Sequence, residues 1–163
     1  MDRKQSVVLL VDDEPKFLES ISERIRLKGF AALPAENGEK ALEIARKQSV
    51  DLAIVDQKMP GMDGLTTITK LREIDPHIRT VLLTGFGNDK LREAAEALDA
   101  PYFEKDKMRA FWDFIRQYGE KSGRIIVDPR TGSVEMAPVG GRAGGQQGIA
   151  RAEVRRYSLP PLQ

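Results

Sequence analysis

The chain has 163 residues, 40% of them hydrophobic and 31% charged, which is typical of a single globular domain with a substantial core. Its formal net charge of +1 gives no electrostatic footprint for nucleic acid. No apolar run approaches the roughly 20 residues of a membrane-spanning helix. The absence of cysteine excludes a disulfide framework and a thiolate metal site, and it fits a reducing compartment. We therefore expect a cytoplasmic protein with no membrane segment.

Short apolar runs and amphipathic patterns alternate from the N-terminus onward. The run Ser6–Val11 predicts a buried strand, and Pro15 suits the first turn of the helix that follows. This helix has apolar residues at near-helical spacing and ends at Gly29. Its apolar residues are Phe17, Leu18, Ile21, Ile25 and Leu27. A short strand at Ala31–Pro34 and an amphipathic helix at Asn37–Ser49 continue the alternation.

The same alternation continues to residue 118. Val50–Asp56 is apolar on both faces at its centre, as expected for a strand when helices cover both sides of a parallel sheet. The remaining predicted elements are a helix at Leu65–Ile74, a strand at Thr80–Gly85, a helix at Asp89–Leu98, a short strand within Pro101–Lys105 and a helix at Met108–Tyr118. Five strands that alternate with five helices predict an α/β fold with right-handed crossovers and an open, mostly parallel sheet.

Polar residues stand at the carboxyl ends of these predicted strands. Asp12 and Asp13 follow the first strand, whereas Asp56, Thr84 and Lys105 lie at the ends of the third, fourth and fifth. In a parallel sheet these ends meet at one edge, where ligands bind in such folds. Carboxylates gathered there repel one another and favour a hard divalent cation, typically Mg²⁺. With a hydroxyl and an ammonium group as donors, the set predicts phosphoryl transfer to Asp56.

Each of these residues alone has a simpler interpretation. Asp12 and Asp13 could cap the helix that follows them, since aspartate favours that position. Asp56 could begin a turn, and Thr84 and Lys105 could be ordinary surface residues. Their combination in one chain, each at the end of a predicted strand, favours the phosphoryl-transfer site.

Four motifs follow one another along the chain: VDDEP from Val11, IVDQKMPGMDG from Ile54, LTG from Leu83 and YFEK from Tyr102. In this order and spacing they resemble the receiver domain of two-component response regulators. The resemblance covers roughly residues 7–118. It implies the (βα)5 receiver fold, in which a flavodoxin-like, doubly wound sheet has five parallel strands.

The resemblance also implies a role for each polar residue at this edge. It makes Asp56 the phosphoacceptor and, with Thr84 and Lys105, part of the catalytic set. Lys105 would pair with the phosphoryl group. The implied cofactor is Mg²⁺, and its implied ligands are Asp12, Asp13, Asp56 and the backbone carbonyl of Lys58.

Two residues are implied to form a conformational switch. Thr84 would be the switch hydroxyl, and Tyr102 matches the aromatic side chain that changes rotamer when this hydroxyl moves. An alternative interpretation of Tyr102 is an aromatic residue that simply packs in the sheet.

One departure from the family concerns the residue after Lys105. The family usually has a proline there, often with a cis peptide bond, whereas this chain has Asp106. Because a cis bond before another residue costs roughly 3 kcal/mol, we expect a trans bond. Lys58 and Phe86 occupy variable positions that in the family influence the loss of the phosphoryl group to water. We expect the bulky Phe86 to hinder the attacking water.

We expect residues 1–118 to form the receiver domain and residues 119–163 to form a tail. Within this tail, residues 123–138 predict a short hairpin, and the Gly-rich residues 139–148 predict a flexible segment. A tail of this length cannot hold a winged helix, and it has no helix-turn-helix pattern. We therefore expect no DNA-binding domain.

The last predicted helix carries Phe111, Trp112, Phe114 and Ile115, four large apolar residues that exceed one narrow helix face. We expect most of them to be core residues and some to form a homodimer or partner surface.

Two functions of different class follow. The first is a response regulator that takes a phosphoryl group from a histidine kinase or a histidine phosphotransfer protein and signals to a downstream protein. It would catalyse its own phosphorylation and dephosphorylation without being a conventional metabolic enzyme. The alternative is a receiver-like adaptor or assembly domain that acts through its last helix and tail, with phosphorylation incidental.

Overall fold

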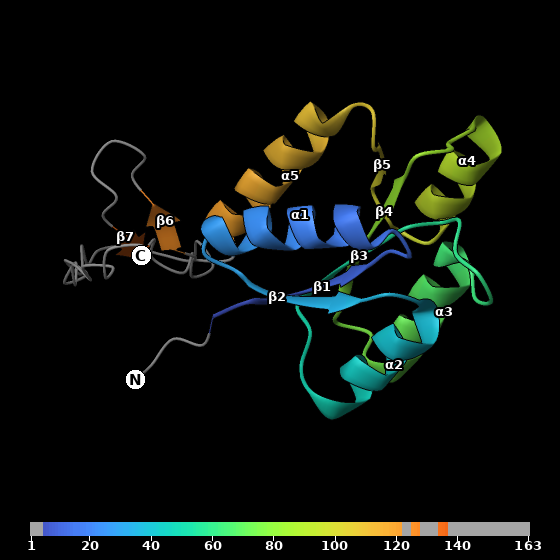
Figure 1. Cartoon of the computed structure of the whole chain (residues 1–163), viewed down its shortest axis with the longest axis horizontal. Helices are drawn as coiled ribbons and strands as arrows, with labels where there is room; N and C mark the ends of the chain where they lie inside the picture. Colours follow the sequence, from blue (N-terminus) through green and yellow to red (C-terminus); the bar gives the residue numbers. More distant parts are fainter. Residues whose placement is uncertain (1–4, 122–124, 128–133, 137–163) are drawn as a thin grey trace, which may run out of the picture. The chain divides into compact units, whose positions relative to one another are not determined.

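The computed structural model describes residues 5–121, 125–127 and 134–136 (Figure 1). The chain divides into two compact units, Met1–Phe111 and Trp112–Gln163. The first unit carries the alternating strands and helices predicted from the sequence. It also contains every residue predicted to form the site.

The strands of the first unit are β1 Val7–Val11, β2 Ala31–Ala35, β3 Leu52–Val55, β4 Arg79–Thr84 and β5 Tyr102–Glu104. They form one sheet in the order β2-β1-β3-β4-β5, and every neighbouring pair is parallel. This order and direction confirm the predicted doubly wound, flavodoxin-like α/β fold. The side chains of β1 and β3 are buried along both strands, as their apolar sequences predict.

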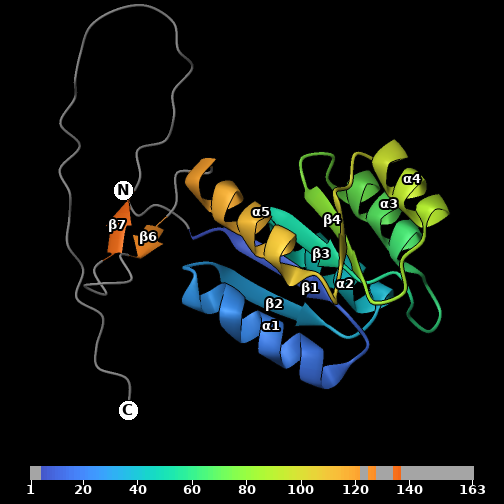
Figure 2. The same ribbon diagram turned by 90° about the horizontal axis from the view of Figure 1, so that it is seen from above.

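The connecting helices are α1 Pro15–Leu27, α2 Gly38–Lys47, α3 Gly64–Ile74 and α4 Asp89–Ala97. Figure 1 shows α1 on one face of the sheet and α2 and α3 on the opposite face. Helices α2 and α3 contact each other, and the turned view in Figure 2 shows the same sheet and helices from above. Within the described ranges, no helix is long and apolar enough to cross a membrane.

Three of these helices begin with a side-chain cap that satisfies a free backbone N–H group. The side-chain oxygens of Asn37, Asp63 and Asn88 each accept a hydrogen bond of 2.8 Å from the backbone three residues later. Each helix begins just after a loop from the carboxyl end of a strand. The caps therefore fix the loops that surround this edge of the sheet.

Helix α1 differs from its predicted apolar pattern at one position. It begins at Pro15, as predicted, and buries Leu18, Ile21 and Ile25. Leu27, the last apolar residue of this pattern, is 68% exposed although it lies within the helix. Since successive helical residues are about 100° apart, Leu27 lies on the side of α1 opposite to Ile25.

Strand β2 is an edge strand with a proline in it. The N–H of Ala31 and the C=O of Ala35 form backbone hydrogen bonds toward the β1 side. Because alternate residues of a parallel strand bond to opposite sides, the backbone of Pro34 faces away from β1. Pro34 has no N–H group, so the outer side of β2 lacks a donor at this point.

Helix α5, Met108–Lys121, begins in the first unit and ends in the second. Phe111 and Ile115 are buried, and Trp112 and Phe114 are partly exposed. The ring of Phe111 packs edge-on against Phe103, with centroids 5.8 Å apart. A core role is thus confirmed for Phe111 and Ile115, whereas the homodimer surface stays a prediction.

In the second unit, β6 Ile125–Val127 and β7 Val134–Met136 pair in antiparallel fashion. They are the two strands of the predicted hairpin, and the turn predicted between them lies outside the described residues. The Gly-rich segment 139–148 lies outside them as well. The domain boundary at residue 118 stays a prediction.

Leu9→Ala is expected to lower the free energy of unfolding by about 2 to 5 kcal/mol, because Leu9 lies in β1 with none of its surface exposed. Leu27→Ala makes the same change on an exposed leucine, and we expect it to cost less than about 1 kcal/mol. Urea unfolding of both variants measures the difference. Equal losses would contradict the burial described for β1 and α1.

Candidate functional site

The polar residues predicted at the strand ends meet at the carboxyl edge of the sheet. Asp12 follows β1, Asp56 follows β3, Thr84 ends β4 and Lys105 follows β5. These four strands are neighbours in the sheet, so the sheet order itself brings the residues together. Backbone hydrogen bonds continue past the strands: Asp56 donates to the carbonyl of Val11 at 2.9 Å, and Lys105 donates to that of Thr84 at 2.9 Å.

Three carboxylates form an acidic cluster at this edge. One oxygen from each of Asp12, Asp13 and Asp56 lies within 4.8 Å of the others. Asp12 is 3% exposed and Asp56 is 6% exposed, whereas Asp13 is open to solvent. Asp12 Oδ1 also accepts a hydrogen bond of 2.9 Å from the backbone N–H of Glu14. The cluster therefore combines two buried charges with one exposed charge.

The ammonium group of Lys105 lies against the two buried carboxylates. Its Nζ is 2.6 Å from Asp12 Oδ2 and 3.5 Å from Asp56 Oδ2, and the side chain is 13% exposed. Burial alone lowers the pKa of Lys105, but the hydrogen bond and charge of Asp12, with the charge of Asp56, raise it above its ordinary value. Lys105 is therefore a fully charged counterion of Asp12 and Asp56.

Asp56 is a carboxylate whose pKa is strongly raised in the folded chain. Burial raises its pKa, and the neighbouring charge of Asp12 raises it further, whereas Lys105 lowers it; the resulting pKa is about 6. A cation near Asp12 and Asp56 would offset both causes of the increase. The pocket thus favours a positive charge that binds both carboxylates.

The residues of the cluster fit a magnesium ion. Carboxylate oxygens are the ligands that Mg²⁺ prefers, and it usually takes one or two of them and keeps several waters. Lys105 already supplies a cation to Asp12 and Asp56, so the pocket is built to hold positive charge. The open Asp13 offers a further carboxylate oxygen on the solvent side. The predicted Lys58 carbonyl ligand stays a prediction.

The loop after Asp56 runs close to the pocket. The backbone N–H of Gly64 donates to the carbonyl of Gln57 at 3.0 Å, and Gln57 Oε1 accepts from Leu65 at 2.9 Å. A Cβ atom at Gly64 would collide with the backbone of Asp56 and Gln57. Only glycine permits this close approach, and the loop thereby fixes the backbone of Asp56.

Comparison with known proteins identifies the family of this chain. The response regulator receiver domain family matches residues 8–106. The chain belongs to this family. Sporulation initiation phosphotransferase F of Bacillus subtilis is 32% identical over 116 residues, which cover 68% of this chain and 91% of that protein. The transcriptional regulatory protein GlrR of Escherichia coli is also 32% identical, but the match covers 54% of this chain and 20% of that protein.

Two solved structures add information about related sites. The response regulator protein TrrA of Thermotoga maritima, in complex with Mg²⁺ and BeF, is 27% identical with a TM-score of 0.61, covering 69% of this chain and 98% of that chain. A response regulator from Burkholderia pseudomallei holds a phosphorylated aspartic acid and a calcium ion. It is 25% identical with a TM-score of 0.59, covering 62% of this chain and 60% of that chain.

The exposed rim of the receiver pocket carries Lys58 and Phe86. Phe86 is 74% exposed, and the Nζ of Lys58 lies 5.0 Å from the centre of its ring. Thr84 is fully buried at the end of β4, and its Oγ1 accepts a hydrogen bond of 3.3 Å from the backbone of Phe86. The effect of Phe86 on the loss of a phosphoryl group stays a prediction.

Tyr102 lies half-buried at the start of β5. Its hydroxyl donates to Glu104 Oε1 at 3.4 Å, and the guanidinium of Arg92 lies 4.7 Å from its ring centre. Burial and the charge of Glu104 raise the pKa of Tyr102. A side chain at Gly87 would occupy the place of the Tyr102 hydroxyl. These contacts place the Tyr102 side chain against α4 and the loop before it. Its switching role stays a prediction.

The loop after Lys105 and one aromatic residue complete the receiver site. Every peptide bond within the described ranges is trans, as predicted for Lys105 and Asp106. Sequence reasoning treated Phe17 only as part of the apolar pattern of α1, yet its ring centre lies 4.2 Å from Lys105 Nζ. The available signal was its position: Phe17 is in the first turn of a helix that begins at this edge.

Asp56→Asn is expected to raise the free energy of unfolding of the metal-free receiver at pH 7 by about 1 to 2 kcal/mol, because it removes a buried charge that Asp12 repels, although water screens part of this repulsion. A raised pKa means that the ionised form of Asp56 destabilises the folded state above pH 6. The gain should therefore shrink as the pH falls from about 6 toward the unfolded value of about 4. Urea unfolding of the wild type and the variant at pH 7 and near pH 4 measures this change in the gain. A variant that is less stable than the wild type at pH 7 would contradict the inference that the Asp56 charge destabilises the folded state.

Proposed function

We propose that this receiver accepts a phosphoryl group on Asp56 from the phosphohistidine of a histidine kinase or a histidine phosphotransfer protein. The observation that carries the proposal is the environment of Asp56. It is a buried carboxylate with a raised pKa, it shares Lys105 with Asp12, and it stands within reach of a third carboxylate, Asp13. This is the pattern of a poised nucleophile beside a cation site.

In the proposed transfer, a carboxylate oxygen of Asp56 attacks the phosphorus atom of phosphohistidine. A P–O bond forms, the P–N bond breaks, and its electron pair returns to the imidazole of the donor. The ammonium of Lys105 lies 3.5 Å from Asp56 Oδ2, so it can donate to a phosphoryl oxygen on that carboxylate. The hydroxyl of Thr84, on the neighbouring strand, supplies a second donor.

Mg²⁺, when bound, would neutralise the negative charge that the carboxylates and the phosphoryl oxygens bring together. The residues that would hold it are Asp12, Asp13 and Asp56, with the Lys58 carbonyl as a further ligand. The Mg²⁺ in the TrrA structure supports this choice of metal.

The proposed output is a change in protein contacts near Tyr102. Thr84 and Tyr102 belong to neighbouring strands, β4 and β5. A shift of the Thr84 hydroxyl toward a phosphoryl group would open space beside β5, and Tyr102 would lose its present contacts with Arg92 and Glu104. A downstream protein that binds this surface would then distinguish the two states. We place this signalling in the cytoplasm, which the cysteine-free sequence and the family support.

Incubation with Mg²⁺ and acetyl phosphate is expected to add one phosphoryl group to the wild-type protein and none to Asp56→Asn. Intact mass detects the group, and size-exclusion chromatography detects a change in assembly. Asp99→Asn is the matched control, since Asp99 is exposed with a φ of 53°, a conformation that asparagine adopts readily. It should accept the group like the wild type.

Failure of the wild type to accept the group under conditions that label an established receiver would overturn the proposal. It would favour the adaptor function, in which Asp56→Asn leaves partner binding intact. That outcome directs attention to α5 and the tail.

Asp13→Asn is expected to raise the Mg²⁺ concentration needed for half-maximal labelling by roughly ten-fold, equivalent to about 1.4 kcal/mol, since it removes one negative ligand. Because Asp13 is exposed, its substitution should leave the unfolding curve unchanged. Titration of Mg²⁺ at fixed acetyl phosphate measures the change. An unaltered Mg²⁺ requirement would remove Asp13 from the proposed ligand set.

A further inference from the structure

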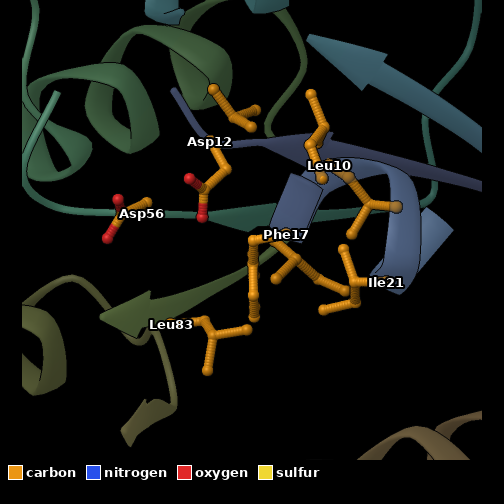
Figure 3. A pocket seen from close by; sticks show the side chains of 9 residues that line it. Leu10, Asp12, Phe17, Ile21, Asp56 and Leu83 are labelled. Carbon is orange, nitrogen blue, oxygen red and sulfur yellow. The ribbon is translucent and has the colours of Figure 1, made fainter. Parts of the chain in front are cut away.

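The ring of Phe17 lies at the inner side of the acidic pocket. Phe17 is in the first turn of α1, which begins two residues after Asp13. With Leu18, Ile21 and Leu83, it lines a narrow cavity of about 10 Å³, about the space of one water, whose polar end is formed by Asp12 and Asp56 (Figure 3). The ring therefore stands between the apolar interior and the charged groups.

Lys105 has contacts of two kinds in this pocket. Its Nζ lies 2.6 Å from Asp12 Oδ2 and 3.5 Å from Asp56 Oδ2, and it lies 4.2 Å from the ring centre of Phe17. The 4.2 Å distance to the Phe17 ring is well within the range in which an aromatic face attracts a cation. This attraction is stronger where water is excluded, and the Lys105 side chain is only 13% exposed.

The two charged contacts of Lys105 cannot stay unchanged during phosphoryl transfer. One oxygen of Asp56 forms the new bond to phosphorus, and Asp12 is a proposed metal ligand. Each event withdraws negative charge from the present ion pair. The ring of Phe17 takes part in neither event, so its attraction for the ammonium group persists throughout.

The backbone around Lys105 does not fix its side chain. Lys105 donates its N–H to Thr84, and Lys107 donates to Glu104 at 3.0 Å, which holds the backbone of the loop. Asp106 supplies no proline ring to stiffen it further. The four-carbon side chain beyond the backbone has many rotamers, and the Phe17 ring restricts them by holding the terminal nitrogen.

We propose that Phe17 is a positioning residue that keeps the ammonium group of Lys105 at the pocket through a cation–π contact while Asp12 and Asp56 change partners. The proposal rests on the role of Lys105 in the proposed function. In this proposal, the first turn of α1 helps to position the side chain of Lys105, the phosphate-pairing lysine.

Phe17→Leu removes the ring and keeps an apolar side chain, and it is expected to slow labelling of Asp56 by acetyl phosphate about five-fold or more. Phe17→Tyr keeps the aromatic face and should restore most of the rate. In a Lys105→Met background, Phe17→Leu should cause no further loss, since the cation is absent. Phe30→Leu removes a buried ring before β2, at the other end of the strands, and controls for lost packing. If Phe17→Leu unfolds, Phe17→Met serves as the ring-free variant.

A second measurement follows the contact itself without any phosphodonor. The side-chain methylene protons of Lys105 next to its ammonium group should show an upfield NMR shift from the Phe17 ring. Phe17→Leu should abolish this shift, and Phe17→Tyr should preserve it. A wild type that shows the shift but is not labelled would overturn the proposed function and, with it, the positioning role.

The positioning role is overturned by either of two results in a protein that is labelled. One is a folded Phe17→Leu variant that is labelled at the wild-type rate. The other is a Phe17→Leu variant whose labelling rate falls by the same factor in the wild-type background and in the Lys105→Met background. That result would assign the effect to packing.

Discussion

Two buried carboxylates, those of Asp12 and Asp56, share the ammonium group of Lys105 at the carboxyl edge of the sheet. Each carboxylate in such a place loses hydration, and each repels the other, so the folded chain tolerates them only beside a positive charge. The sheet order makes β1 and β3 neighbours, which brings the two carboxylates close together. The same order brings the end of β5 near, and Lys105 there supplies the neutralising charge. The capped helices and the glycine at position 64 then hold the surrounding loops in place.

The strand that leads to Lys105 also contacts a surface outside the pocket. Lys105 and Tyr102 lie three residues apart along β5 and the loop after it. Tyr102 in turn contacts Arg92 of α4 and Glu104, which are themselves 4.0 Å apart. Lys105 therefore directly follows a strand whose first residue contacts α4. Only the three residues of β5 separate the α4 contact from the pocket lysine.

The fold could be predicted because its rules act locally and repeat. Apolar runs such as Val50–Asp56, followed each time by a helical pattern, are sufficient to predict a parallel sheet and to gather the polar residues at its edge. The contacts of individual side chains could not be predicted this way. Leu27 has an apolar side chain that its helix turns outward, and Phe17 has a partly buried side chain whose ring faces a cation. Both depend on side-chain direction after packing, which periodicity alone does not give.

Pro34 limits how this molecule can meet others of its kind. An exposed strand edge is a template with which a strand of a second chain can pair through backbone hydrogen bonds. Sheets with such an edge are prone to polymerise. The outward-facing proline interrupts that template at the fourth residue of β2, because an incoming carbonyl at this point finds no donor. Backbone pairing on the β2 side thus has one hydrogen bond fewer to offer, which favours recognition there through side chains, whose identity can change with each partner, over recognition through the backbone, which every sequence shares.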